Sequence, residues 1–230
     1  MDFLKRNKVF IIVVLATLVL LIGGIYLFSR GSGNSTTLSS TVSSSLLIPQ
    51  NDYETSGIVN GNYLLATPSA SVTLVEFGDY ECPACGEYHP MVKQLLTDFA
   101  GKVIFVFRNF PLSQHLNAPI SAYAAEAAGL QGKFWQMHDK LYETQNDWSG
   151  STDARSIFIG YAKDLGLDVT KFTADIDSSA VKNKVQSDMN DGNTIGINET
   201  PTFFLNGSEL NLTGSSNELE TDVQKVLNGK

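Results

Sequence analysis

The chain contains two cysteines, and they lie together in the run Cys82-Pro83-Ala84-Cys85. Two thiols at this spacing can close into a small, easily reduced disulfide. Because the chain has no other cysteine, the pair does not belong to a structural disulfide framework. The pair is therefore either redox-active or part of a metal site, and the residues around it favour redox chemistry.

The elements beside the cysteines are a strand and a helix. The β-branched and apolar run at residues 72–77 predicts a buried strand. Pro83 suits the first position of a helix, and apolar residues at helical spacing continue to Phe99. The sequence therefore predicts a strand, a short turn with the first cysteine, and then a helix over residues 82–99.

This order places Cys82 at a helix N-terminus. Backbone N–H groups and the helix dipole stabilise an anion there, which lowers the pKa of a thiol. We expect Cys82, the outer cysteine, to be the attacking nucleophile. Cys85, one turn inside the helix, is then the resolving thiol.

Glu76 is an unusual residue for a buried strand, because an ionised carboxylate there is costly unless it is paired. Two interpretations are open. Glu76 either points out at a sheet edge, or it is a buried acid behind the disulfide that manages protons for Cys85.

The order of strand, Cys-Pro-x-Cys and helix, with an acid before the first cysteine, resembles the thioredoxin superfamily. More specifically, the sequence resembles the DsbA-like thiol–disulfide oxidoreductases. The resemblance runs from about residue 57 to the C-terminus, and four stretches carry it: residues 77–85, residues 103–112 with His115, residues 124–138, and residues 196–207.

The resemblance implies an α/β, thioredoxin-like fold with a helical insertion at about residues 115–195. It implies that Pro201 is a cis-proline beside the disulfide, and X-Pro is the bond with an appreciable cis population. Thr200, just before it, is expected to bind the extended substrate chain, and Pro83 and Ala84 to contact substrate. The implied redox group is the disulfide itself, with no other cofactor and no metal.

The resemblance implies a thiol–disulfide oxidoreductase that introduces disulfides into exported proteins. One position departs from the best-known DsbA proteins, which carry histidine just before the second cysteine, where this chain has Ala84. We therefore expect a weaker oxidant than the extreme DsbA case. The alternatives are a reductase or isomerase of the same fold, or a non-catalytic binding or chaperone module.

Metal binding by the cysteines is the remaining chemical alternative. His89 follows Cys85 by one helical turn, so Cys82, Cys85 and His89 could supply part of a zinc site. A structural zinc site usually has four ligands, and the fourth would have to come from a distant residue. The family resemblance argues against this site.

The N-terminus predicts a membrane anchor. Residues 9–28 carry no charge and are long enough to cross a bilayer as a helix. Basic residues precede them, so we expect residues 1–8 in the cytoplasm and the catalytic domain outside. The rival is a cleaved signal peptide, whose apolar region is usually about 7–15 residues. The sequence favours a single-pass signal-anchor helix in the cell membrane.

The rest of the chain divides into a Ser/Thr/Gly-rich flexible linker at residues 29–52 and a DsbA-like domain at residues 53–230. The formal net charge is -8 at pH 7, which argues against a nucleic-acid partner. The expected partners are the thiols of exported proteins and a membrane redox protein that recycles the active site.

Periodicity predicts the other elements of the domain. An Asn206-Gly207 pair predicts a hairpin turn. The expected strands are residues 57–65, 103–108, 202–205 and 209–212, and the expected helices are residues 118–130, 133–144, 153–165, 169–176, 180–190 and 216–227.

Overall fold

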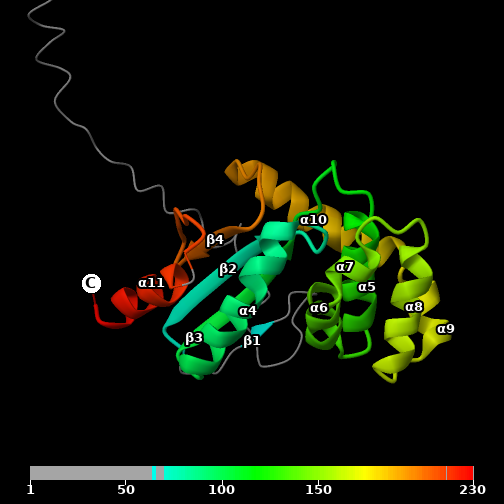
Figure 1. Cartoon of the computed structure of the whole chain (residues 1–230), viewed down its shortest axis with the longest axis horizontal. Coiled ribbons are helices and arrows are strands. Elements are labelled where there is room, and N and C mark those ends of the chain that lie inside the picture. Colours follow the sequence, from blue (N-terminus) through cyan, green and yellow to red (C-terminus); the bar gives the residue numbers. More distant parts are fainter. Residues whose placement is uncertain (1–63, 66–69, 216, 230) are drawn as a thin grey trace, which may run out of the picture. The chain divides into compact units, whose positions relative to one another are not determined.

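The computed structural model describes residues 64–65, 70–215 and 217–229 (Figure 1). The predicted anchor helix at residues 9–28 and the linker at residues 29–52 lie outside the described residues. Among the helices that are described, none is both long and apolar enough to cross a membrane.

The described strands form one sheet in the order β1-β3-β2-β4-β5. The central strand β2 (Val72–Gly78) pairs in parallel with β3 (Val103–Asn109) and antiparallel with β4 (Thr202–Leu205). A parallel pair needs a crossover, and helix α4 (Pro83–Asp98) provides it. The short edge strands are β1 (Leu64–Leu65) and β5 (Ser208–Glu209).

The Asn206-Gly207 turn is confirmed. Both residues have positive φ, 48° for Asn206 and 85° for Gly207, which a tight two-residue hairpin requires. The following strand is shorter than the predicted residues 209–212. The N–H of Leu210 still donates to the carbonyl of Phe203, but the chain beyond it lines a cavity instead of extending the ladder.

The helical block between β3 and β4 confirms the predicted insertion. Its helices are α5 (Ala118–Gly129), α6 (Phe134–Glu143), α7 (Gln145–Trp148), α8 (Ala154–Asp164), α9 (Val169–Asp175) and α10 (Ser179–Ile195). In Figure 1, α5 to α9 stand together on one side of the sheet strands, and α11 (Glu218–Leu227) lies on the other side.

Helix α10 runs to Ile195, beyond its predicted end at residue 190. Gly192 looks like a helix breaker in the sequence, but it lies inside the helix and is buried. A Cβ there would lie 2.7 Å from the ring of Phe110. The glycine therefore allows close packing on Phe110, and the helix ends instead at Gly196, which adopts φ 89°.

Both faces of the sheet are buried. Alternate residues of β2 point to opposite faces, so Leu74 packs in the core cluster that includes α4. Val75 and Phe77 pack with Phe204 in a separate cluster. Glu76 follows Leu74 by two residues, so its side chain lies on the same face of the sheet as Leu74, the face that carries the active-site helix.

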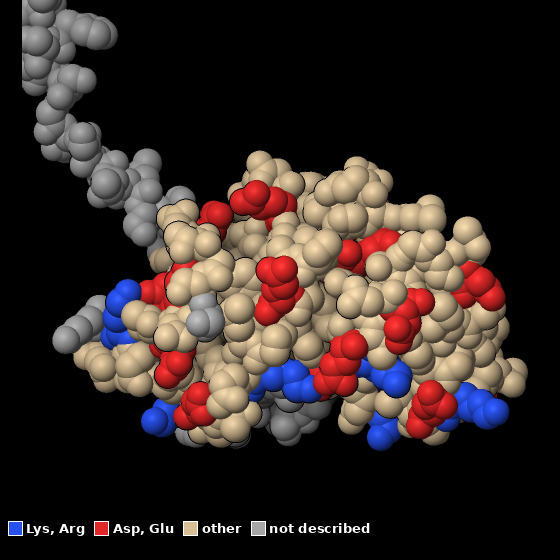
Figure 2. All heavy atoms as spheres, in the orientation of Figure 1, with Lys and Arg blue, Asp and Glu red and all other residues tan. Residues whose placement is uncertain are grey.

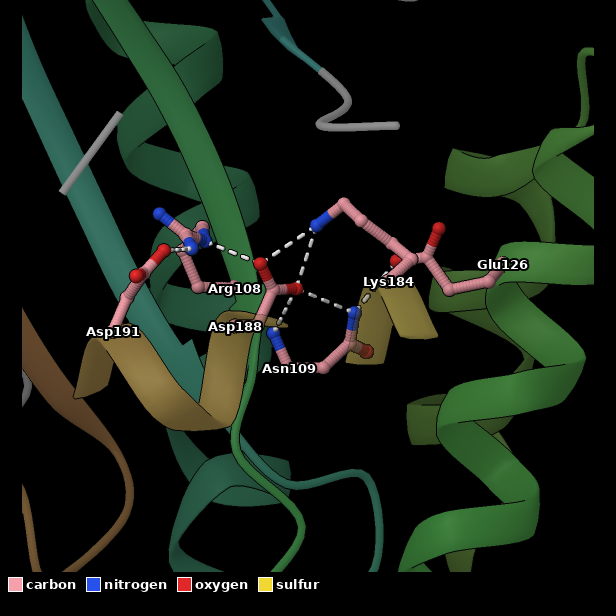
Figure 3. Close-up of polar contacts among 6 residues, drawn as sticks. All are labelled: Arg108, Asn109, Glu126, Lys184, Asp188 and Asp191. Atoms are coloured by element: carbon pink, nitrogen blue, oxygen red, sulfur yellow. Dashed lines mark hydrogen bonds and ion pairs between the residues drawn. The ribbon is translucent and has the colours of Figure 1, made fainter. Parts of the chain in front are cut away.

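A buried charged network joins β3 to the insertion (Figure 3). Arg108 is fully buried and donates to Asp188 at 2.6 Å, while Asn109 donates to Asp188 at 3.0 Å. Burial raises the pKa of Glu126, which accepts from Asn109, to about 7. The residues of the network are Arg108, Asn109, Glu126, Lys184, Asp188 and Asp191. These contacts fix α5 and α10 on the strand that neighbours β2.

Candidate active site

The turn before the first cysteine is organised by Asp79, which is 1% exposed. Its carboxylate accepts from the backbone N–H of Glu81 at 2.8 Å and of Leu112 at 2.9 Å, and pairs with His115 Nδ1 at 2.6 Å. The Asp79 carbonyl accepts from the N–H of Cys82. Asp79 therefore ties the turn between β2 and α4 to the loop that follows β3.

The two cysteines are thiols in this structure, and both are buried. Cys82 is the N-cap of α4, and its Sγ lies 3.3 Å from the carbonyl oxygen of Thr200. The Thr200–Pro201 peptide bond is cis, the conformation that the resemblance implies. Cys85 is fully buried, and its Sγ accepts from the N–H of Asp79 at 3.5 Å.

The two thiols have opposite acidities. The hydrogen bond from the Cys85 thiol is the largest cause that lowers the pKa of Cys82, from 9.0 to about 5. Backbone N–H groups of Ala84 and Cys85 at the helix start add to this effect, against the cost of burial. Burial raises the pKa of Cys85 well above its ordinary value. At neutral pH the site therefore holds a thiolate at Cys82 beside a neutral thiol.

Glu76 is 3% exposed and lies on the central strand, so the interpretation as a residue at a sheet edge is wrong. Burial, with a smaller contribution from the charge of Cys82, raises the pKa of Glu76 to about 8. Its charge in turn raises the pKa of Cys85. A carboxyl group with this pKa can give or take a proton near neutral pH.

Gly78 leaves room for the Glu76 carboxyl group. A Cβ at Gly78 would lie 2.9 Å from Glu76 Oε1 and 2.4 Å from the Phe107 ring. A larger residue would displace the acid or the ring. The sequence marks Gly78 only as the end of the strand, and the close approach appears only in the folded chain.

Gln145 is a site residue that the sequence analysis missed. From the start of α7, its Nε2 donates to the carbonyl oxygens of Tyr80 at 2.7 Å and Cys82 at 2.8 Å. The Glu81 carboxylate accepts a short hydrogen bond from the backbone N–H of Asn117, just before α5. The helical insertion therefore holds the active-site turn from two points.

One of the predicted substrate-binding residues, Ala84, lines a cavity beside the cis-proline. Ala84 and Pro201 line a cavity of about 390 Å³, together with Glu87 and Glu199. Pro83 is exposed beside Ala84. Thr200 is buried, and its carbonyl oxygen accepts a hydrogen bond from the Cys82 thiol. The cavity is open to solvent and large enough for part of an extended peptide.

The metal alternative proposed from the sequence does not form. Among the described residues, the group with metal-ligand spacing consists of His89, His138 and Asp139, and it includes neither Cys82 nor Cys85. His89 therefore lies with residues of the insertion, not with the thiols.

Residues 59–225 match the sequence profile of the thioredoxin family. The chain belongs to this family. Its fold is also that of solved oxidoreductases. A thioredoxin-like oxidoreductase from Silicibacter pomeroyi DSS-3 is 27% identical, with a TM-score of 0.62 over 73% of this chain and 93% of that one. Oxidised BdbD from Bacillus subtilis is 26% identical, with a TM-score of 0.66 over 76% and 97%.

The thiol-disulfide exchange protein α-DsbA2 from Wolbachia pipientis shares the fold, with a TM-score of 0.65 at 20% identity over 82% of this chain and 95% of that one. The fold is therefore that of DsbA-like thiol–disulfide oxidoreductases. The curated relatives include the Na(+)/H(+) antiporter NhaA 1 of Salinispora arenicola, 40% identical over 60% of this chain. The chain spans only 20% of that relative's length.

Proposed function

We propose that this protein is an extracytoplasmic thiol–disulfide oxidoreductase that introduces disulfides into exported proteins. The observation that carries the proposal is the pairing of a Cys82 thiol, whose pKa is lowered to about 5, with a buried Cys85 thiol of raised pKa. A low pKa stabilises the reduced site and makes its disulfide a better oxidant. The match to antiporters covers too little of their length to support ion transport.

The oxidation proceeds in two exchange steps. A substrate thiolate attacks the Sγ of Cys82 in the disulfide, the S–S bond breaks, and its electron pair goes to Cys85, which takes a proton. Glu76, whose pKa is raised to about 8, supplies that proton. A second substrate thiolate then attacks the substrate sulfur of the mixed disulfide, and Cys82 leaves as a thiolate.

The product is an oxidised substrate and a protein that has gained two electrons. A membrane redox partner must accept those electrons to restore the disulfide. Pro201 and Thr200 lie beside the sulfur that is attacked, where an extended substrate backbone can bind. No cofactor other than the Cys82–Cys85 pair takes part in this scheme.

The first test is the equilibrium reduction potential of the pair against a glutathione buffer. A value near about -120 mV supports a strong oxidase, and one near about -270 mV, typical of thioredoxin, refutes the oxidase proposal in favour of a reductase. Oxidation of a reduced dithiol peptide by the protein gives the direct assay. Cys82→Ser must abolish it, and activity that survives this substitution would point to another mechanism.

The proposed location rests on the uncharged residues 9–28 and the basic residues before them. Because Cys82 and Cys85 are the two cysteines of the chain, a membrane-impermeant thiol reagent reports on the domain alone. We expect it to label the reduced protein in intact cells. Labelling only after cell lysis would place the domain in the cytoplasm and refute the extracytoplasmic proposal.

A further inference from the structure

Helix α4 and the insertion helix α6 meet at a group of metal-ligand type. One ring nitrogen of His89, one of His138 and one carboxylate oxygen of Asp139 lie within 4.8 Å of one another. His89 is on the active-site helix, one turn after Cys85, and the other two residues are on α6. The group lies outside the thiol site described above.

His89 Nε2 is the atom that points to a ligand. The residue is 6% exposed, and this nitrogen has no hydrogen-bond partner in the structure. It lies 3.5 Å from Asp139 Oδ1, close to the separation of about 3.3 Å between two ligands of a tetrahedral zinc ion. A buried polar atom without a partner is costly, and a cation between these two atoms would satisfy it.

His138 is positioned as metal-bound histidines usually are. It is 3% exposed, and its Nδ1 lies 3.1 Å from the Tyr80 hydroxyl. When Nδ1 carries the proton and donates it to that hydroxyl, the lone pair of Nε2 is free to bind a cation.

Access and charge also fit a cation. His89 lines a cavity of about 460 Å³ that opens to solvent, with Lys93 and Glu143 on its wall. Lys93 donates to Asp139 Oδ2 and to Glu143. The other carboxylate oxygen of Asp139, Oδ1, faces His89. The Lys93 side chain is 45% exposed, so it can turn to solvent when a metal ion neutralises Asp139.

We propose that His89, His138 and Asp139 form a binding site for a divalent transition-metal ion of the zinc class. Imidazole nitrogens favour this class over Mg²⁺ or Ca²⁺. Three protein ligands leave a fourth position for a water molecule. Because α4 carries the active-site cysteines, the bound ion would link that helix to the insertion and stabilise the folded chain.

The test uses the full chain in detergent with Cys82→Ser and Cys85→Ser, so that the thiols bind no metal. Titration with Zn²⁺ alone, followed by calorimetry, is expected to show one ion per chain. Co²⁺ is expected to give a visible absorption band on binding. His89→Ala and Asp139→Asn should each weaken binding by about tenfold or more.

His115→Ala is the matched control, because it removes the remaining histidine of the chain and should bind Zn²⁺ like its parent. Lys93→Gln removes the competing ammonium group and should tighten binding by about two- to fivefold. Zn²⁺ should also raise the melting temperature of the parent but not that of His89→Ala. Asp139→Asn keeps the shape of its side chain, so it reports on binding even if a histidine variant does not fold.

Two outcomes would overturn the proposal. One is the absence of Zn²⁺ binding and of a Co²⁺ band in the parent protein. The other is binding that His89→Ala and Asp139→Asn leave unchanged, which would assign the ion to other residues. Neither outcome bears on the proposed exchange reaction, because the reduction potential is measured on the chain with both cysteines.

Discussion

The acidity of Cys82 depends on the thiol donor at position 85, and two substitutions can separate that donor from the helix terminus. Cys85→Ala removes the hydrogen bond that is the largest cause of the lowered pKa of Cys82. Cys85→Ser keeps a donor, and its hydroxyl is a stronger one than a thiol. Both variants lose the resolving thiol, so they differ in the hydrogen bond and little else.

The size of the effect follows from the energy of that bond. A hydrogen bond to a charged group contributes about 1.5–3 kcal/mol, and a thiol is a weak donor, so the lower end applies. That energy corresponds to about one pH unit in the titration midpoint. With its pKa at about 5, wild-type Cys82 is about 90% ionised at pH 6. The Ala variant should be about half ionised there, and the Ser variant should stay near wild type.

The assay is the pH dependence of the alkylation rate by iodoacetamide. Each variant has Cys82 as its single cysteine, so the whole rate reports on that thiolate. Thermal unfolding of each variant checks that the fold is intact. If the Ala and Ser variants share a midpoint near that of the wild type, the helix terminus alone sets the acidity and our reasoning is refuted. A shared midpoint near the ordinary thiol value would mean that the turn has rearranged.

Three further substitutions test the proton donor and the polar contacts around the site. Glu76→Gln removes the proton donor to Cys85, so formation of the mixed disulfide should slow at neutral pH. The wild-type protein should lose rate above about pH 8, where Glu76 ionises, and the variant should not, as measured by stopped-flow exchange. Gln145→Leu removes the side-chain donor to the carbonyls of Tyr80 and Cys82, although the Cys82 carbonyl still accepts from the N–H of Gly86, and should cost about 1 kcal/mol in denaturant unfolding. Asp188→Ala leaves buried Arg108 without its main partner and should cost about 3–5 kcal/mol in thermal or denaturant unfolding.

Each of these three predictions can be contradicted by a specific result. An unchanged pH profile in Glu76→Gln would mean that solvent supplies the proton to Cys85. Gln145→Glu, which keeps the length of the side chain but loses its two N–H donors, should be at least as destabilised as Gln145→Leu. Wild-type stability in Asp188→Ala would mean that the neighbouring carboxylates compensate for Arg108.

The sequence predicts the reactive centre because its determinants are local. The cysteine spacing, the proline at the helix start and the apolar run of β2 lie within a single stretch of chain, and their periodicities are those of the elements observed. Gln145 could not be found in this way. It contacts the turn from 63 residues away, and it does so through backbone carbonyls, which every residue has.

The location of Glu76 shows a second limit. Its strand is central only because β4, which follows the whole insertion, pairs on the side opposite β3. The sequence shows that strand but not its neighbours, so it favours a buried acid without excluding a residue at a sheet edge. The order of the strands decides between them, and it depends on contacts between Glu76 and residues such as Phe203, far along the chain.

The opposite pKa shifts of Cys82 and Glu76 give the reduced protein a particular dependence on pH. Cys82 holds fewer protons in the folded state than in the unfolded chain between about pH 5 and 9, so this group adds stability as the pH rises. Glu76 holds more protons in the folded state between about pH 4.5 and 8, so its contribution falls as the pH rises.

Each of these slopes is at most about 1.4 kcal/mol per pH unit, and they oppose each other over the shared range. Oxidation removes the contribution of the Cys82 thiol to the free energy of unfolding and leaves the part of the Glu76 contribution that comes from burial. The stability of the reduced protein relative to the oxidised one therefore grows as the pH rises from about 5 toward neutrality. A disulfide whose reduction is favoured in this way takes electrons from unfolded substrates with ordinary thiols. Above about pH 8 Glu76 is ionised, and its negative charge repels the Cys82 thiolate, so the gain in stability of the reduced protein is limited there.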